Sequence, residues 1–398
     1  MTASHKHGLG AVPTLMPDKS PKRTVLFLTG TRADYGKLLP LIQAVDADPG
    51  FHCRIFVTGM HTLKRYGYTV EEVFRSGVQD IHVVNNQYLS EPMDLTRANT
   101  IACLARHISE LPPDLLVVHG DRVEALAGAI VGSIRNIPTA HIEGGELSGT
   151  IDGAIRHAVS KMSHLHFVAN TEAYDRLLQL GESADSVFEI GSPDIDVMLS
   201  DKLPHITEVK RHYAIDFDRY TILLFHPVTT DIEHAYEHAQ AVVDACIASG
   251  RRFVVIYPNN DEGSEHIFTA YRRFEGNKNF RVFASIRFEY FLTLLRHADL
   301  LVGNSSAGIR EAPVYGIPSV DIGNRQAGRF HHSSIIHCSP NAVAIQNAID
   351  AAMRRPTVQK TLHFGEGNSA TRFMEVLRRK ELWNVKTEKA FIDISRLQ

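Results

Sequence analysis

Short runs of apolar and β-branched residues alternate with helix-length segments along most of the chain. These runs lie at residues 24–29, 53–58, 81–84, 115–119, 139–143, 165–169, 221–225, 253–257, 280–283, 300–302 and 319–322. This alternation is typical of βαβ units that build a parallel sheet. In the segment 122–134, Val123, Leu126, Ala127, Ile130 and Ile134 recur at helical spacing. We expect these five side chains to cover one face of a sheet.

The runs form two series, and the chain is long enough for two lobes. Its 398 residues exceed the size of one comfortable hydrophobic core. Gly191, Pro193 and Pro204 indicate a linker at residues 190–204. The predicted division is a flexible tail at 1–22, two Rossmann-like lobes at 23–190 and 191–370, and a C-terminal segment at 371–398. A helix in that last segment is predicted to pack back on the first lobe.

Composition excludes several classes of partner. The chain has 42 Lys and Arg residues against 45 Asp and Glu residues, so it lacks the large basic field that nucleic acid or an anionic membrane surface requires. No apolar segment reaches the roughly 18 residues needed to span a bilayer. Cys53, Cys103, Cys246 and Cys338 are scattered through apolar segments and are interpreted as reduced core residues. We therefore expect a cytoplasmic protein.

Polar residues follow the first and fourth runs, at the strand ends where doubly wound folds bind ligands. The first run ends in a turn that contains Arg32 and Asp34 and opens a helix whose amide groups can receive an anion. This turn lacks the G-x-G-x-x-G pattern, which argues against a nicotinamide cofactor. The fourth run ends in Asp121 and Arg122. An ordinary βα turn and a local ion pair are the structural alternatives to a phosphate site.

A glycine-rich loop rich in carboxylates follows the fifth run. It contains Glu143 and Glu146, and Asp152 lies just beyond it. Carboxylates that share a cleft repel one another, which raises at least one pKa and suits that group to acid/base catalysis. A calcium loop is the alternative, but the alternating ligand spacing of an EF-hand is absent. The 22 histidines of the chain also form no pair with metal-ligand spacing, so we expect no metal.

The strand ends of the second lobe supply groups suited to a nucleotide. His226 follows the first strand of this lobe and is a catalytic candidate, although a lone histidine is more often structural. Asn259, Ser285 and Phe288 follow the next two strands and offer an amide, a hydroxyl and an aromatic edge for a nucleobase and ribose.

The segment from Gly303 to Pro313 is the strongest signal in the second lobe. Ser305 and Ser306 are expected to open a helix at a strand end, where a diphosphate would bind. Glu311 is predicted to lie about two turns inside that helix, within reach of a ribose, and Arg325 follows the next strand as a further phosphate contact. The G-x-S-x-G elbow of a hydrolase nucleophile is absent.

Six strings in this sequence resemble the hydrolysing UDP-N-acetylglucosamine 2-epimerases of sialic acid biosynthesis. They are GTRADYGKL, HGDRVEALAG, HIEGGELSGTIDGAIRH, FHPVTT, YPNNDEGSE and GNSSAGIREAP, in this order, and the resemblance extends from Lys22 to the C-terminal helix. It implies the GT-B fold, which consists of two doubly wound Rossmann-like lobes with a cleft between them. It also implies that UDP binds mainly to the second lobe, that neither NAD nor a metal is needed, and that the products are UDP and free N-acetylmannosamine.

The resemblance also assigns roles to particular positions. Asp121, Glu143 and Asp152 match the catalytic carboxylates of the family and His226 matches its second-lobe histidine. The positions around UDP are matched by Arg32, Asp34, Arg122, Ser305, Ser306, Glu311 and Arg325. Many members carry a second acid directly after Asp152, whereas this chain has Gly153. That difference bears on the charge of the loop and on the preferred sugar.

Several functions remain open on the sequence alone. The sugar could be N-acetylglucosamine or a 2,4-diacetamido-2,4,6-trideoxy sugar, because related bacterial epimerases use much the same strings. A GT-B glycosyltransferase would share the lobes and the UDP site, and a sugar-nucleotide sensor would share the phosphate-binding groups. The resemblance further implies a homodimer or homotetramer.

Overall fold

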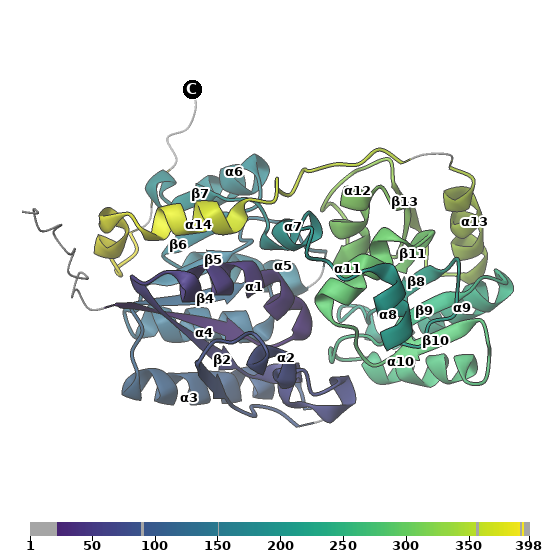
Figure 1. Cartoon of the computed structure of the whole chain (residues 1–398), viewed down its shortest axis with the longest axis horizontal. Coiled ribbons are helices and arrows are strands. Elements are labelled where there is room, and N and C mark those ends of the chain that lie inside the picture. The colour runs from purple at the N-terminus through teal and green to yellow at the C-terminus, as the bar shows by residue number, and fades with distance from the viewer. Residues whose placement is uncertain (1–21, 89–90, 150, 356–357, 391, 394–398) are drawn as a thin grey trace, which may run out of the picture.

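Two parallel sheets, each covered by helices on both faces, organise the chain in the computed structural model (Figure 1). The structure describes residues 22–88, 91–149, 151–355, 358–390 and 392–393. Apart from Lys22, the predicted N-terminal tail lies outside the described residues.

The first sheet has the strand order β3-β2-β1-β4-β5-β6-β7 within the described residues. Its strands are β1 (Arg23–Thr29), β2 (Phe51–Val57), β3 (Asp80–Val83), β4 (Leu115–His119), β5 (Thr139–Ile142), β6 (Leu165–Val168) and β7 (Val187–Glu189). The helices of this lobe are α1 (Arg32–Ala47), α2 (Val70–Phe74), α3 (Met93–Glu110), α4 (Val123–Ile134), α5 (Ile151–Met162) and α6 (Thr171–Gln179). The central strands are continuous apolar runs because both faces of a parallel sheet are buried.

The second sheet repeats this winding, with the strand order β10-β9-β8-β11-β12-β13 among the described strands. Its strands are β8 (Thr221–Leu224), β9 (Phe253–Ile256), β10 (Phe280–Phe283), β11 (Leu300–Gly303), β12 (Ser319–Ile322) and β13 (Ile335–Cys338). The helices of this lobe are α8 (Ile206–His212), α9 (Ala235–Ala248), α10 (Ser264–Tyr271), α11 (Phe288–Arg296), the 3₁₀ turn η6 (Ser306–Gly308), α12 (Glu311–Tyr315) and α13 (Ala342–Met353). The predicted class of two doubly wound Rossmann-like lobes is confirmed.

Three details differ from the sequence-based expectation. Strands β7 and β13 were not predicted, because β7 is only three residues long and β13 is a half-exposed edge strand that forms no apolar run. Glu143 was expected to end a strand, but β5 stops at Ile142. Ile134 was expected to cover the sheet, yet it is the last residue of α4 and is 74% exposed.

The chain passes between the lobes at two places that touch each other. Helix α7 (Pro193–Met198) lies within the predicted linker and packs against α1. The chain returns near Phe364, whose carbonyl oxygen accepts a hydrogen bond from the Ser192 amide at 2.7 Å. It then forms α14 (Ser369–Leu377), which lies on the first lobe beside α1 (Figure 1).

Among the described helices, none is both long and apolar enough to cross a membrane. All four cysteines are free thiols. Cys53 and Cys246 are buried as expected, whereas Cys103 and Cys338 are half-buried and not part of the core proper.

Replacing Phe373 with Ala is expected to destabilise the first lobe by about 3–5 kcal/mol, because this α14 ring is fully buried. It packs edge-on against Phe167, with the ring centroids 4.7 Å apart. Denaturant unfolding followed by circular dichroism measures the change. The control is Glu375→Ala at an exposed position of the same helix, which should cost less than about 0.5 kcal/mol. Equal effects of the two substitutions would contradict the packing of α14.

Candidate functional site

A cavity of about 260 Å³ lies between the lobes, at the carboxyl ends of the strands of both sheets. All fourteen residues singled out from the sequence line it: Arg32, Asp34, Asp121, Arg122, Glu143, Asp152, His226, Asn259, Ser285, Phe288, Ser305, Ser306, Glu311 and Arg325. This convergence follows from topology, because the winding of both sheets directs every βα turn to the same side.

The turn after β1 is held by Asp34, which leaves Arg32 free to reach across the cleft. The Asp34 carboxylate accepts hydrogen bonds from the Gly30 and Thr31 amides at 3.0 and 2.9 Å, and Thr31 caps α1 in return. Arg32 donates to Ser285 Oγ of the second lobe at 2.6 Å and also pairs with Glu72. Asp34 therefore shapes the turn, and Arg32 is the side chain that spans the lobes.

Arg122 also spans the cleft. It donates to Glu124 of its own lobe at 3.3 Å and to Asn260 Oδ1 of the second lobe at 3.0 Å. The Arg122 guanidinium lies 3.6 Å from Asp261 as well.

The acidic loop after β5 holds Glu143 in a left-handed backbone conformation, with φ at 62°. Such a value is costly for a residue with a side chain, and the surroundings fix it at both ends of the residue. The Glu143 amide donates to the Phe167 carbonyl at 2.9 Å, and its carbonyl accepts from Arg156. Gly145 follows with φ at 75°, and a Cβ there would lie 2.2 Å from the Ala173 carbonyl oxygen. The loop thus needs glycine beside its acids.

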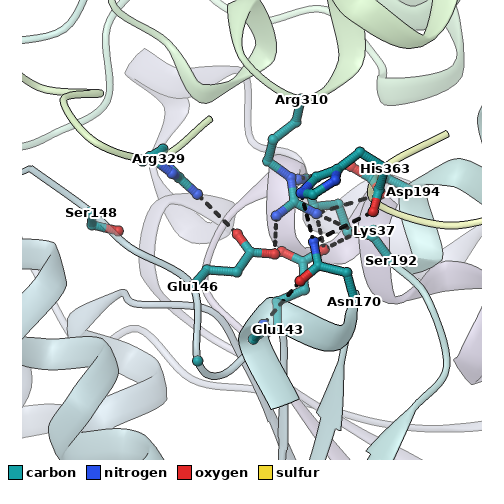
Figure 2. Close-up of polar contacts among 12 residues, drawn as sticks. Lys37, Glu143, Glu146, Ser148, Asn170, Ser192, Asp194, Arg310, Arg329 and His363 are labelled. Atoms are coloured by element: carbon teal, nitrogen blue, oxygen red, sulfur yellow. Dashed lines mark hydrogen bonds and ion pairs between the residues drawn. The ribbon is translucent and has the colours of Figure 1, made fainter. Parts of the chain in front are cut away.

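Repulsion between Glu143 and Glu146 does not set their pKa values, because cations outweigh it. Both are buried, and burial alone would raise the pKa of each, but the Arg310 guanidinium between them and the other cations nearby together reverse the effect (Figure 2). The pKa of Glu143 is lowered well below its usual range, and that of Glu146 is lowered as well. Arg329 donates a further bond to Glu146 at 3.1 Å. The raised pKa that the sequence predicts for at least one of the carboxylates therefore does not belong to Glu143 or Glu146.

Asp152 is the predicted catalytic carboxylate whose pKa is raised. Burial is the larger cause and the neighbouring Asp121 charge is the second, while Arg325, 3.4 Å away, opposes both. Asp121 behaves oppositely: burial raises its pKa, but Arg156, Arg329 and Arg325 together with the Ser148 hydrogen bond lower it further than burial raises it. Asp121 also accepts a hydrogen bond from Ser148 at 2.9 Å. The two aspartates therefore form an asymmetric, coupled pair in the cleft.

His226 is positioned by its backbone and by one ring nitrogen. The Asn304 side chain bonds both the amide and the carbonyl of His226, at 2.7 and 2.8 Å. The Asn259 amide donates to His226 Nδ1 at 3.1 Å, so the neutral ring carries its proton on Nε2. Burial, followed by the charges of Arg325 and Arg122, lowers the pKa of His226 well below its usual value. This side chain can donate a hydrogen bond without carrying a charge.

The segment after β11 offers hydroxyls and amides at the edge of the cavity. Gly303 has φ at 142°, and a Cβ there would lie 2.0 Å from the Leu224 carbonyl oxygen, so glycine allows β8 and β11 to approach. Ser305 caps the short turn η6 that begins at Ser306. Glu311 is the first residue of α12 and not two turns inside a helix, which corrects the sequence-based expectation. It pairs with Lys37 of the first lobe at 3.1 Å.

Comparison of the sequence with known proteins identifies the family of this chain. Residues 43–378 match the profile described as UDP-N-acetylglucosamine 2-epimerase. The chain belongs to this epimerase family. A Neisseria meningitidis protein named UDP-N-acetylglucosamine 2-epimerase is 46% identical over 376 residues, which cover 94% of this chain and 100% of that one.

Two other relatives of the epimerase family carry more specific names. A Legionella pneumophila protein named UDP-N,N'-diacetylbacillosamine 2-epimerase (hydrolyzing) is 30% identical, with 89% of this chain and 96% of that one covered. The polysialic acid biosynthesis protein P7 of Escherichia coli is 32% identical, with 82% and 85% covered.

Solved structures of epimerases share the fold at low sequence identity. A Neisseria meningitidis UDP-GlcNAc 2-epimerase bound to UDP-GlcNAc has a TM-score of 0.75 at 19% identity, covering 89% of this chain and 99% of that one. The Methanocaldococcus jannaschii UDP-GlcNAc 2-epimerase in complex with UDP-GlcNAc and UDP has a TM-score of 0.76 at the same identity and coverage.

At Gly153, the position after Asp152, the structure leaves little room for a side chain. A Cβ at Gly153 would lie 2.8 Å from the Ser148 carbonyl oxygen. An acidic side chain would therefore require the loop after β5 to shift.

Sequence reasoning missed four buried residues that bond to the groups of the cleft: Lys37 and Arg310, which line the cavity, and their partners Ser192 and Asp194. Lys37 and Arg310 do lie inside two of the strings that carry the family resemblance. A lysine in a helix and an arginine between two turns carry no local pattern that marks them as buried. The only feature of the sequence that could have indicated Lys37 and Arg310 is their position within those strings.

We predict that the His226 imidazole stays neutral from about pH 5.5 to pH 8, because a lowered pKa leaves the ring unprotonated throughout that range. NMR spectra of ¹⁵N-histidine protein, assigned with His226→Gln, measure this. Exposed His234 is the internal control, since its hydrogen bond to Asp231 raises its pKa and it should titrate in the same window. A His226 signal that titrates together with His234 would disprove the assignment.

Proposed function

We propose that this epimerase is hydrolysing, converting UDP-N-acetylglucosamine and water to UDP and N-acetylmannosamine as the first step of sialic acid biosynthesis. The observation that carries the proposal is the convergence of Asp121, Glu143 and Asp152 with a neutral His226 and several arginines in one interlobe cavity. The names of the 30% and 32% identical relatives, one hydrolysing and one from polysialic acid biosynthesis, support it.

The reaction needs two proton transfers at one carbon atom. In the first step a base takes the C2 proton while the C1–O bond breaks, so that UDP leaves with the bonding electrons and a glycal remains. In the second step water adds its hydroxyl to C1, and an acid returns a proton to C2 from the opposite face. A base and an acid must therefore face the sugar on its two sides.

The ionisation of the carboxylates suggests how these duties divide. Asp152 has the raised pKa, so it is the one of the three carboxylates that gains a proton most readily. Asp121, kept anionic by Arg156, is suited to accept a hydrogen bond from water or to stabilise a developing positive charge. The Nε2–H of His226 is suited to donate to an oxygen of the leaving diphosphate, as Arg122 and Arg325 are by their charge.

The sugar has a second candidate. The Legionella pneumophila relative and a 29% identical Campylobacter jejuni relative are both named as hydrolysing epimerases of N,N'-diacetylbacillosamine nucleotides. We therefore propose UDP-2,4-diacetamido-2,4,6-trideoxy sugar as the alternative substrate. The cytoplasmic location and the homodimer or homotetramer stay predictions.

Proton NMR in heavy water tests the proposal directly. The protein is incubated with UDP-N-acetylglucosamine, without an acceptor and without added metal. We expect free N-acetylmannosamine deuterated at C2, together with UDP. Accumulation of UDP-N-acetylmannosamine would instead indicate nonhydrolysing epimerisation. Turnover of the diacetamido nucleotide alone would favour the alternative sugar, and no turnover of either nucleotide would favour a transferase or a sensor.

Asp152→Asn is expected to lower kcat by about 10²- to 10⁴-fold, because the amide cannot exchange the C2 proton. UDP release and deuterium incorporation at C2 measure the loss. Asp185→Asn, at an exposed position of the same lobe, is the matched control and should retain wild-type rates. Equal activity of the two variants would remove Asp152 from the proposed chemistry.

A further inference from the structure

Arg310 is a fully buried cation, 1% exposed, that the second lobe directs into the acidic loop of the first. One terminal nitrogen of its guanidinium donates to Glu146 and the other to Glu143, the latter at 2.8 Å (Figure 2). The second nitrogen also donates to Ser192, beside the crossing between the lobes. The guanidinium lies 4.6 Å from the centroid of the Phe364 ring, on the returning crossing. One side chain thus contacts the acidic loop and both chain crossings.

These contacts hold the Glu143 carboxylate in place. Its Oε1 accepts from Arg310 and from the Ser192 hydroxyl, and its Oε2 lies 3.1 Å from His119 Nε2. The Glu143 backbone is in the left-handed region, which is unfavourable for a residue with a side chain. Removing a partner of its carboxylate would therefore allow the residue to relax away from this conformation. The Glu143 carboxylate is thus fixed in position and kept charged, which makes it poorly suited to accept or donate a proton during the reaction.

Arg310 also belongs to the segment proposed to hold the diphosphate. It lies five residues after Ser305 and directly before Glu311. While Ser305 and Ser306 line the cavity at the phosphate end, the Arg310 guanidinium reaches the carboxylates of the opposite lobe. The segment from Ser305 to Glu311 therefore contributes both the proposed phosphate site and the Arg310 side chain that bonds to Glu143 and Glu146.

We propose that Arg310 is a positioning residue which fixes Glu143 from the opposite lobe, so that the diphosphate segment and the acidic loop assemble as one unit. This inference rests on the proposed hydrolytic epimerase function. In this arrangement Glu143 acts as a fixed negative charge beside His119, and Asp152, next to the anionic Asp121, carries the proton chemistry.

The pH dependence follows from the groups that face Glu143. They are Lys37 from α1, His119 from β4, Arg156 from α5, Glu146 from the same loop, Asp194 from α7 and Arg310 from the second lobe, and Glu311 of the second lobe shares the partner Lys37. Burial raises the Glu143 pKa, and Arg310 is the largest of the charges that bring it down, followed by Lys37 and His119. Without Arg310 the acids outnumber the cations that remain beside them, so the pKa of Glu143 rises. Glu143 then binds a proton at higher pH than in the wild type, and activity falls off at a higher pH on the acid side of the profile.

The primary test compares pH–rate profiles of Arg310→Met and the wild type, with UDP release as the assay. We expect the acid limb of kcat to move up by about 1–3 pH units in Arg310→Met. The dissociation constant for UDP should change by less than about threefold, because the serines and amides of the segment remain. Arg310→Lys keeps one charge and should fall between the two. An unshifted acid limb in Arg310→Met would overturn the proposal.

Arg329→Met is the matched control, because it removes an arginine of the same lobe and the same cluster whose bond goes to Glu146 and not to Glu143. Its acid limb should stay closer to that of the wild type than to that of Arg310→Met. Equal shifts in the two variants would mean that net charge, and not the bond to Glu143, sets the profile.

A second measurement does not depend on turnover. In protein labelled with ¹³C at the glutamate carboxyl carbon, the Glu143 signal is assigned with Glu143→Gln and titrated. We expect it to titrate at higher pH in Arg310→Met than in the wild type, and equal titration would contradict the inference. If the wild type releases no UDP, the proposed function fails while this titration still tests the role proposed for Arg310. If Arg310→Met does not fold, Arg310→Met/Glu146→Gln, which leaves one fewer unpaired acid, replaces it in both experiments.

Discussion

Charge that is buried must be matched by opposite charge nearby, and this constraint shapes the whole space between the lobes. Among the described side chains, Lys37, Arg156, Arg310 and Arg329 face Asp121, Glu143, Glu146, Asp194 and Glu311. Neither lobe holds a balanced set of its own, because Arg310 and Arg329 come from the second lobe while Glu143 and Glu146 come from the first. Opening the cleft would leave unpaired charges on both sides, so the network favours the closed arrangement.

Much of this architecture could be predicted because it depends on local patterns. Apolar runs identified most strands, and topology then brought their polar carboxyl ends to one cavity, where all fourteen predicted residues lie. The failures have equally physical causes. The edge strands β7 and β13 are too short or too exposed to form an apolar run. Glu143 leaves its strand because backbone bonds to Phe167 and Arg156 hold it, and neither partner is near it in sequence.

The electrostatics of the site could not be predicted for a related reason. Three carboxylates close together in sequence suggested repulsion, but the sign of each pKa shift depends on which cations reach them. Glu143 and Arg310 are separated by 167 positions, and no sequence pattern gives the distance between their side chains. The expected raised pKa occurs at Asp152. Arg156 forms its ion pair with the neighbouring Asp121 and not with Asp152. The asymmetry that suits acid/base chemistry therefore arises from the distribution of arginines and not from crowding of acids alone.

A lobe-spanning network also bears on how the elimination and hydration of the proposed reaction could share one site. A glycal that escaped into solvent before water added would be lost, so the second step benefits from a cleft that stays closed after the C1–O bond has broken. Contacts of UDP with both lobes would weaken as soon as UDP became a leaving group. The bonds of Arg310 to Glu143 and Glu146, and of Lys37 to Asp194 and Glu311, are made by the protein alone and need no contact with UDP. Closure maintained by the protein's own charges would allow the intermediate to remain beside Asp121 and Asp152 until the second proton is delivered.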